Sequence, residues 1–293
     1  MNVLSLFDGC SGARLALTRA NKKIDKYYTC EIDKYSSMVT KLNFPDTIAL
    51  GDVTKVNFEM LPKIDFLIGG SPCQDLSFAK GNGKGLEGER SGLFYKYFEA
   101  LEVLRKKNPE IKFLLENVKM KQKWKDIISD LLGVQPIFIN SADFSAQNRQ
   151  RLYWTNIPVD EWIPCEDKLQ DIKETDAEDR YYYSPKMLAW IDRHGKRKNK
   201  KLRIQSDDDK VQMIEASHFK GCSSQRFFAI EDKKGLRYIT ITETERAQTV
   251  PDRYTKCGQK ETGEIVEISN TQRYKMLGNG FNIATVTHII KNL

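Results

Sequence analysis

Residues 66–74 read FLIGGSPCQ, a short apolar run followed by two glycines, a serine, a proline and Cys73. The run at 66–68 is typical of a buried strand. Because proline restricts the backbone just before the cysteine, the thiol is presented where the strand ends. In α/β enzymes this is where ligand-binding and catalytic groups lie. Cys73 is therefore a candidate nucleophile, although a structural thiol buried in a turn has the same local pattern.

Four other apolar runs in the first half also end in a polar cluster. They are residues 2–7 with DGCSG at 8–12, 27–30 with EID at 31–33, 48–50 with GDV at 51–53, and 112–115 with ENV at 116–118. A helical stretch is expected from Ala13. Alternating strands and helices, with polar groups at the carboxyl ends of the strands, predict a doubly wound α/β fold with a mostly parallel sheet.

Composition limits the class of protein. A chain of 293 residues allows one large domain or two smaller ones. No run approaches the roughly 18 apolar residues of a membrane span, and the N-terminus lacks a secretion signal, so we expect an intracellular protein. Six scattered cysteines without a C-x-x-C pair, and three histidines, predict reduced thiols and no metal site.

Charge is unevenly distributed in the second half. The chain carries 47 basic and 40 acidic residues, a net charge of +7, which permits a polyanionic partner. Residues 160–179 hold nine acids and two lysines, whereas 186–203 hold eight basic residues and one acid. The basic run at 196–201 fits a solvated loop as well as it fits a phosphate contact.

The alternation of strands and helices breaks down between about 156 and 237, which predicts a small domain or a long insertion. Beyond it, 242–248 and the apolar pattern of 271–293 look helical.

The first strand ends suggest a cofactor pocket. The glycines of FDGCSG at 7–12 let the backbone approach a ligand and offer N–H donors, although the spacing is not G-x-G-x-x-G. Glu31 follows about twenty residues later, where an acid commonly binds ribose hydroxyls. Asp52 ends the third strand, where it is placed to meet an adenine amino group. Together these residues predict a pocket for an adenosine-containing cofactor.

Five motifs, in order, give a resemblance to a known family. They are FDGCSG at 7–12, GGSPCQDLSF at 69–78, ENV at 116–118, QNRQR at 147–151 and GN at 278–279. With these motifs the chain resembles the DNA cytosine-5 methyltransferases of bacteria and phages, over nearly its whole length outside the variable middle. The resemblance implies a Rossmann-like, S-adenosylmethionine-dependent methyltransferase sheet with a second, smaller target-recognition domain. We place the catalytic and cofactor-binding domain at 1–155 plus 270–293 and the recognition domain at 156–269.

The family's chemistry assigns roles to four residues. Carbon 5 of cytosine is a poor nucleophile until a thiolate adds to carbon 6, and the resemblance gives this step to Cys73. Glu116 would protonate or hydrogen-bond ring nitrogen 3, for which it must be at least partly protonated. Arg151 would hold the base carbonyl oxygen, with Arg149 beside it. The cytosine must be flipped out of the duplex to reach them.

The resemblance also implies the cofactor and its contacts. The cofactor is S-adenosylmethionine, and the residues expected to bind it are Phe7, Gly9, Ser11, Gly12, Glu31, Ile32, Asp52, Val53, Pro72, Asn279 and Gly280. Two of them depart from the family: Gly280 stands where serine is common, and Ser11 where glycine is frequent. We expect these departures to affect cofactor affinity rather than activity, because neither removes a catalytic group.

The implied partner is double-stranded DNA. Residues 74–93 combine glycines with basic side chains and are expected to form a lid that closes on it. The candidate DNA-binding residues are Gln74, Ser77, Lys84 and Arg90 in this lid and Gln225 and Arg226 in the middle segment. We expect no membrane contact and a monomer in the cytoplasm of a bacterium or a phage-infected cell, with room for a companion restriction endonuclease.

Three other functions stay open at this point. A tRNA cytosine-5 methyltransferase would use the same active site, and the sizeable middle region argues for DNA. A catalytically inactive DNA-binding regulator would not need Cys73, Glu116 and Arg151 together. A nicotinamide dehydrogenase fits the sheet alone, but the missing G-x-G-x-x-G and the Pro-Cys loop oppose it.

Overall fold

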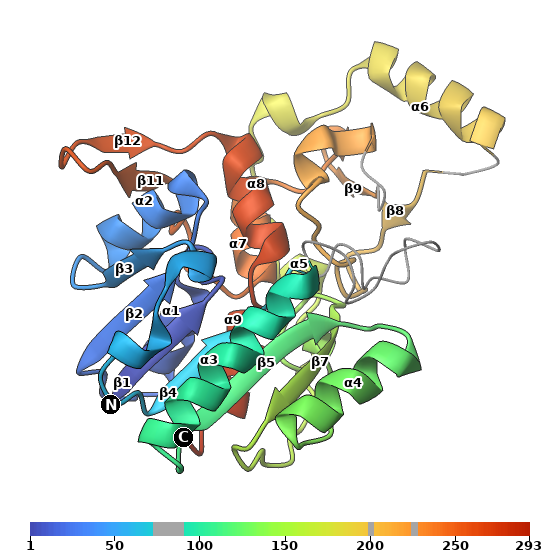
Figure 1. Ribbon diagram of the computed structural model, residues 1–293. Coiled ribbons are helices and arrows are strands. Elements are labelled where there is room, and N and C mark those ends of the chain that lie inside the picture. Colours follow the sequence, from blue (N-terminus) through green and yellow to red (C-terminus); the bar gives the residue numbers. More distant parts are fainter. Residues whose placement is uncertain (73–90, 199–201, 224–227) are drawn as a thin grey trace.

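A computed structural model describes residues 1–72, 91–198, 202–223 and 228–293 (Figure 1). Its centre is a seven-stranded sheet with the order β3-β2-β1-β4-β5-β7-β6. The strands are β1 (Asn2–Leu6), β2 (Lys26–Cys30), β3 (Ile48–Gly51), β4 (Phe66–Gly69), β5 (Lys112–Val118), β6 (Ile137–Asn140) and β7 (Gln150–Thr155). All neighbours pair in parallel except β7, which is antiparallel to both β5 and β6. The predicted α/β fold with a mostly parallel sheet is therefore confirmed.

Helices cover both faces of the sheet because side chains of a strand alternate between its faces. Val3 of β1 packs in one buried cluster with α1 (Gly12–Arg19) and α9 (Ile283–Ile289). Its neighbour Leu4 packs in a second cluster with α3 (Phe94–Lys107) and α4 (Gln122–Leu132). Two further helices, α2 (Lys34–Asn43) and α8 (Asn270–Asn279), lie near the carboxyl ends of β1 and β2.

The middle segment, residues 156–269, adds further helices and strands to this frame. They are α5 (Leu169–Ile172), α6 (Pro185–Lys198), α7 (Ile241–Ala247), β8 (Ile204–Gln205), β9 (Ala229–Asp232), β10 (Gly235–Arg237), β11 (Cys257–Gln259) and β12 (Ile265–Glu267). Strands β8, β9 and β10 form one small sheet, and β11 and β12 form another. Short 3-10 turns lie at Val53–Lys55, Phe58–Met60, Ser91–Leu93, Ser141–Asp143, Asp179–Tyr181 and His218–Ser223. The helix expected over 242–248 corresponds to α7.

The middle segment shares the core of the sheet. Ile214, Ile230 and Val250 belong to the same buried cluster as Val3 of β1. By contrast, α6 projects from the body in Figure 1, and its Ile191 belongs to a small separate cluster. Much of 156–269 thus packs directly on the residues that we assign to the catalytic domain. The division of the chain into two domains at 156 and 269 stays a prediction.

The arrangement brings the predicted site residues to one edge. The carboxyl ends of β1 to β5 point the same way, and α8 lies across the ends of the first of these strands (Figure 1). One expectation shifts slightly: ENV at 116–118 lies within β5 rather than after it. The reason is that β7 continues the pairing as far as Val118, opposite Arg151. Within the described ranges, no helix is long and apolar enough to cross a lipid bilayer.

Candidate active site

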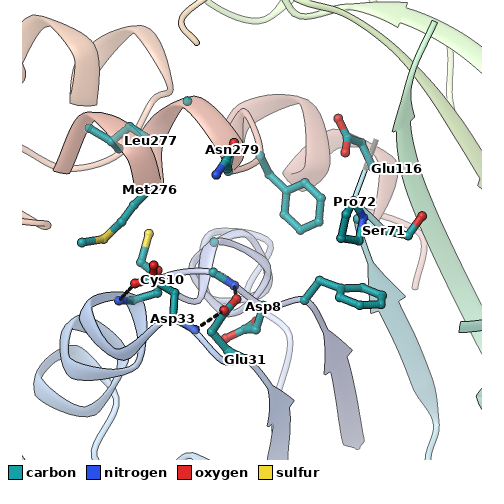
Figure 2. A pocket seen from close by; sticks show the side chains of 18 of the residues that line it. Asp8, Cys10, Glu31, Asp33, Ser71, Pro72, Glu116, Met276, Leu277 and Asn279 are labelled. Carbon is teal, nitrogen blue, oxygen red and sulfur yellow. Dashed lines mark hydrogen bonds between the residues drawn. The ribbon is translucent and has the colours of Figure 1, made fainter. Parts of the chain in front are cut away.

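A cavity of ≈ 520 Å³ lies between the strand ends and the turn that joins α8 to α9 (Figure 2). The strand-end loops line one wall, and Met276, Leu277 and Asn279 of α8 line the other. The sequence-predicted residues that line it are Phe7, Gly9, Gly12, Glu31, Ile32, Asp52, Val53, Pro72, Glu116, Arg149, Arg151, Asn279 and Gly280. Residues separated by more than 200 positions in the sequence therefore meet around one cavity.

The loop after β1 has an unusual backbone. Phe7, Gly9 and Ser11 adopt left-handed conformations, with φ of 59°, 60° and 60°. Such a conformation is strained for the two residues that carry a side chain. The amide of Gly9 donates a hydrogen bond to Oε2 of Glu31 at 2.8 Å, which ties the loop to the end of β2. Contacts within the protein thus hold the loop in this shape beside the cavity.

A buried carboxyl group holds this loop from beneath. The hydroxyl of Tyr27 donates to Oδ1 of Asp8 at 2.8 Å, and that of Ser11 donates to Oδ2 at 2.6 Å. Burial raises the pKa of Asp8 to about 6, although these hydrogen bonds act in the opposite direction. Asp8 also lines the cavity and was not among the residues expected to bind the cofactor.

Ser11 does not line the cavity, unlike the other expected cofactor residues. Its side chain is fully buried, and its hydroxyl lies 2.9 Å from that of Thr40 as well as against Asp8. Because the left-handed backbone turns the hydroxyl inward, Ser11 braces the loop and its side chain does not face a ligand. The assignment of Ser11 as a cofactor-binding residue stays a prediction.

The acids at the end of β2 accept backbone hydrogen bonds from their own loop. Oε1 of Glu31 accepts from the amides of Ile32 at 2.8 Å and Asp33 at 2.7 Å. Asp33 caps α2 by accepting from Tyr35 and Ser36, and it also forms an ion pair with Lys275 of α8 at 3.0 Å. The Asp33–Lys275 pair therefore links the two walls of the cavity.

Asp52 plays the same kind of role after β3. Its Oδ1 accepts from the amide and the hydroxyl of Thr54, at 2.9 and 2.8 Å. These hydrogen bonds lower the pKa of Asp52. The carboxylate is therefore fixed and charged at neutral pH, ready to accept further hydrogen bonds from a ligand.

The opposite end of the cavity holds a carboxylate paired with a guanidinium. Nε of Arg151 on β7 lies 2.7 Å from Oε1 of Glu116 on β5, with side-chain exposures of only 9% and 11%. Space for this carboxylate depends on Gly70, where a Cβ atom would lie 3.1 Å from Oε2 of Glu116 and 3.1 Å from the ring of Phe281. The guanidinium of Arg151 is a planar, permanently charged donor, and together with the carboxyl group of Glu116 it can bind the polar edge of a ring.

The segment just before Cys73 is tied to this pair. The side-chain amide of Asn117, next to Glu116 on β5, donates to the hydroxyl of Ser71 at 3.0 Å. Ser71 is buried and Pro72 lines the cavity. Ser71 and Pro72, the last described residues before Cys73, therefore lie at the Glu116 end of the cavity (Figure 2).

Arg149 supports the site in a different way from Arg151. Its buried guanidinium donates to the carbonyl oxygens of Ile214 at 3.2 Å, Gly278 at 3.4 Å and Gly280 at 2.8 Å. These contacts hold the turn between α8 and α9 against β7. Arg149 lines the cavity, and both of its terminal nitrogens donate to the protein backbone.

Sequence reasoning missed several lining residues besides Asp8. Tyr254 donates its hydroxyl to the carbonyl oxygen of Cys10 at 2.6 Å, and Lys275, Met276 and Phe281 complete the α8 wall. Asp8 belongs to the FDGCSG motif, but the sequence did not show that its carboxyl group is buried beside the cavity. Tyr254, Lys275, Met276 and Phe281 belong to no motif. They reach the cavity only because the C-terminal segment folds over the sheet.

Some predicted residues lie outside the described part of the chain. They are the candidate nucleophile Cys73 and the candidate DNA-binding residues Gln74, Ser77, Lys84, Arg90, Gln225 and Arg226. Their roles stay predictions.

The cavity suits an adenosine-containing cofactor. Its volume lies within the usual range for small-molecule sites. Fixed carboxylates at Glu31 and Asp52 match hydroxyl and amino donors, and the exposed side chain of Ile32 offers an apolar contact. Among the described residues, no group of three or more His, Cys, Asp and Glu side chains is arranged to hold a metal ion.

Comparisons with known proteins point in the same direction. A family described as C-5 cytosine-specific DNA methylase matches residues 1–293. Type II methyltransferase M1.ScrFI of Lactococcus lactis subsp. cremoris is 29% identical, covering 99% of this chain and 77% of the relative. Orphan methyltransferase M.SPRI of Bacillus phage SPR is 34% identical over 60% of this chain and 42% of its own length. The solved structure of the Entamoeba histolytica methyltransferase EhMeth has a TM-score of 0.76 at 15% identity, covering 100% of this chain and 97% of that one.

Proposed function

The chain belongs to the C-5 cytosine-specific DNA methylase family, and we propose how its residues carry out the methylation. It is a DNA cytosine-5 methyltransferase that uses S-adenosylmethionine as methyl donor. The observation that supports the residue assignment is the Arg151–Glu116 pair, which lines the same cavity as Ser71 and Pro72, the two residues before Cys73. The fixed carboxylates of Glu31 and Asp52 lie in the same cavity.

The strand-end carboxylates bind the cofactor. Glu31 accepts hydrogen bonds from the ribose hydroxyls, and Asp52 accepts from the adenine amino group. Phe7, Ile32 and Val53 supply apolar contacts from the same wall. When bound, S-adenosylmethionine supplies an electrophilic methyl group.

Cys73 and Glu116 activate the base. The Cys73 thiolate forms a bond to carbon 6, and the electron pair of the 5,6 double bond becomes available at carbon 5. Glu116 donates a proton or a hydrogen bond to ring nitrogen 3, which receives part of the negative charge. Arg151 donates to the base carbonyl oxygen and keeps Glu116 in place, whereas Arg149 positions the α8–α9 turn.

The covalent bond to the enzyme breaks after methylation. Carbon 5 forms its bond to the methyl group while the bond from that methyl group to sulfur breaks, and the sulfur keeps its electron pair. Carbon 5 then loses its proton to a base or a water molecule. The electron pair of that C–H bond restores the double bond and expels the Cys73 thiolate from carbon 6. The enzyme is regenerated, and the product is 5-methylcytosine.

Substrate recognition and cellular context complete the proposal. Residues 156–269 read the DNA sequence, with Gln225 and Arg226 as candidate contacts, and residues 74–93 close over the flipped base. The enzyme acts as a monomer in the cytoplasm of a bacterium or an infected cell. The chain is similar both to a relative named as a type II methyltransferase and to one named as an orphan methyltransferase. The enzyme therefore acts either with a companion endonuclease or without one.

Bisulfite sequencing of cells that express the chain tests this proposal. We expect methylated cytosines in one DNA sequence context with the native protein and none with Cys73→Ala, at equal protein levels. Labelled methyl transfer to duplex DNA and to tRNA, assayed side by side, separates the two substrates. Substantial transfer by Cys73→Ala would refute the assigned nucleophile.

A further inference from the structure

A cluster of lysines follows the active-site strand directly. Lys119, Lys121, Lys123 and Lys125 lie between the end of β5 and the first turn of α4, and residues 117–125 contain no acid. The first three side chains are exposed, and the fourth is half-buried. We call these four residues the post-β5 lysines. Four like charges therefore lie within a few residues of Glu116.

The described part of the protein does not neutralise these charges. Within the described ranges, none of the post-β5 lysines forms an ion pair with a carboxylate. Two instead lie near aromatic rings, with Nζ of Lys119 5.9 Å from the centre of Phe138 and Nζ of Lys123 4.5 Å from that of Trp124. Other surface lysines do pair with acids, as Lys173 does with Asp207 at 2.7 Å.

This placement works against the stability of α4. The amino end of a helix carries partial positive charge, so acids stabilise it and cations destabilise it. Lys121 is the N-cap of α4 and makes no side-chain capping bond, and the first turn contains no acid. Lys121 and Lys125 are also like charges at a helical i, i+4 spacing, which adds repulsion. Folding alone does not explain four cations here, whereas an external polyanion would.

The position of the cluster identifies the polyanion. Val118, the residue before Lys119, lines the cavity and pairs with Arg151 across β5 and β7. A cytosine that reaches Glu116 stays joined to its duplex, so the phosphates on either side of it must pass close to this edge. We propose that the post-β5 lysines bind the phosphate backbone of the DNA next to the flipped cytosine. This inference rests on the proposed function.

A pair of fourfold variants tests the inference. The test variant is Lys119→Gln, Lys121→Gln, Lys123→Gln and Lys125→Gln combined. Its matched control removes four exposed lysines near the opposite, amino-terminal edge of the sheet: Lys23→Gln, Lys26→Gln, Lys63→Gln and Lys106→Gln. Both variants lose four positive charges, so a difference between them reports position rather than net charge.

The measured quantity is the salt dependence of DNA binding. Dissociation constants for a short duplex carrying the methylated sequence are determined by fluorescence anisotropy across a series of salt concentrations. Each lost phosphate contact reduces the slope of log K against log salt by about 0.9. We expect the test variant to lose about 2 to 4 units of slope. The control variant should keep the native slope, and both should bind S-adenosylmethionine with native affinity.

The outcomes separate this inference from the proposed function. Equal slopes for the test and control variants would overturn the lysine contact, while DNA methylation by the native protein would still stand. A reduced slope on tRNA but not on duplex DNA would overturn the choice of DNA as the occupant. If the native protein methylates no DNA at all, the proposed function itself fails. Thermal unfolding of both variants verifies that they are folded.

Discussion

The two ends of the cavity are built in different ways. At the cofactor end, Glu31 and Asp52 accept most of their hydrogen bonds from amides one or two residues further along the chain, and Glu31 also accepts from Gly9. At the catalytic end, Glu116 meets Arg151 because β5 and β7 pair, although 35 positions separate them. One end is thus shaped by local turns, and the other by contacts across the sheet. Substitutions at the two ends should therefore have separable effects on cofactor binding and on chemistry.

The largest effect is expected at the catalytic end. Glu116→Gln keeps the size of the side chain but removes the acid that serves ring nitrogen 3 and pairs with Arg151. We expect the single-turnover rate of methyl transfer to fall by about 10²- to 10⁴-fold. Cofactor affinity, measured by calorimetry, should change little. Glu31→Gln is the matched control, with weakened cofactor binding as its main defect. If both variants lost cofactor binding equally, the two ends would not be separable.

An intermediate effect is expected beneath the cofactor loop. The pKa of Asp8 is raised from 3.8 to about 6, so folding favours its protonated form. The stability that this protonated group contributes is fully present below about pH 4 and is lost as the pH rises through about 6. Asp8→Asn mimics the neutral acid and lacks this dependence. Relative to the variant, the native protein should lose about 2–3 kcal/mol of unfolding free energy across this range.

Chemical denaturation at several pH values measures the Asp8 effect. Asp46→Asn provides a control of opposite sign, because a hydrogen bond from Arg14 lowers the pKa of Asp46 at the surface. Relative to Asp46→Asn, the native protein should gain unfolding free energy as the pH rises through the acid range. Parallel curves for native protein and Asp8→Asn would show that burial does not perturb this carboxyl group.

The smallest effect is expected where the C-terminal half touches the cofactor loop. Tyr254→Phe removes the hydrogen bond to the carbonyl oxygen of Cys10, which is worth about 1 kcal/mol. Cofactor affinity should therefore fall by about fivefold, with the rate at saturation unchanged. Tyr274→Phe removes a similar buried bond, to Ile239, away from the cavity. Tyr274→Phe should lower the free energy of unfolding without changing cofactor affinity. If both variants lost the same cofactor affinity, the effect of Tyr254→Phe would be a general effect on folding.

The cofactor end was largely predictable because its signals are local. Gly9, Glu31 and Asp52 each follow a short apolar run, and the ends of parallel strands meet at one edge. Glu116 and Arg151 were predicted from family motifs; the structure places them 2.7 Å apart, and their catalytic roles stay predictions. The orientation of Ser11 was not predictable, since it depends on the buried partners Asp8 and Thr40.

The α/β class and the order of the strand-end motifs were already evident from the sequence, because they depend on short-range patterns of apolar runs, glycines and acids. The type of chemistry followed from the family resemblance of the motifs. Three features became visible only in the folded protein: Arg149 holds the α8–α9 turn, Tyr254 secures the cofactor loop, and the middle segment shares the core of the sheet. Each of these contacts joins groups far apart in the chain, and no local pattern specifies which distant backbone atom a buried donor will meet.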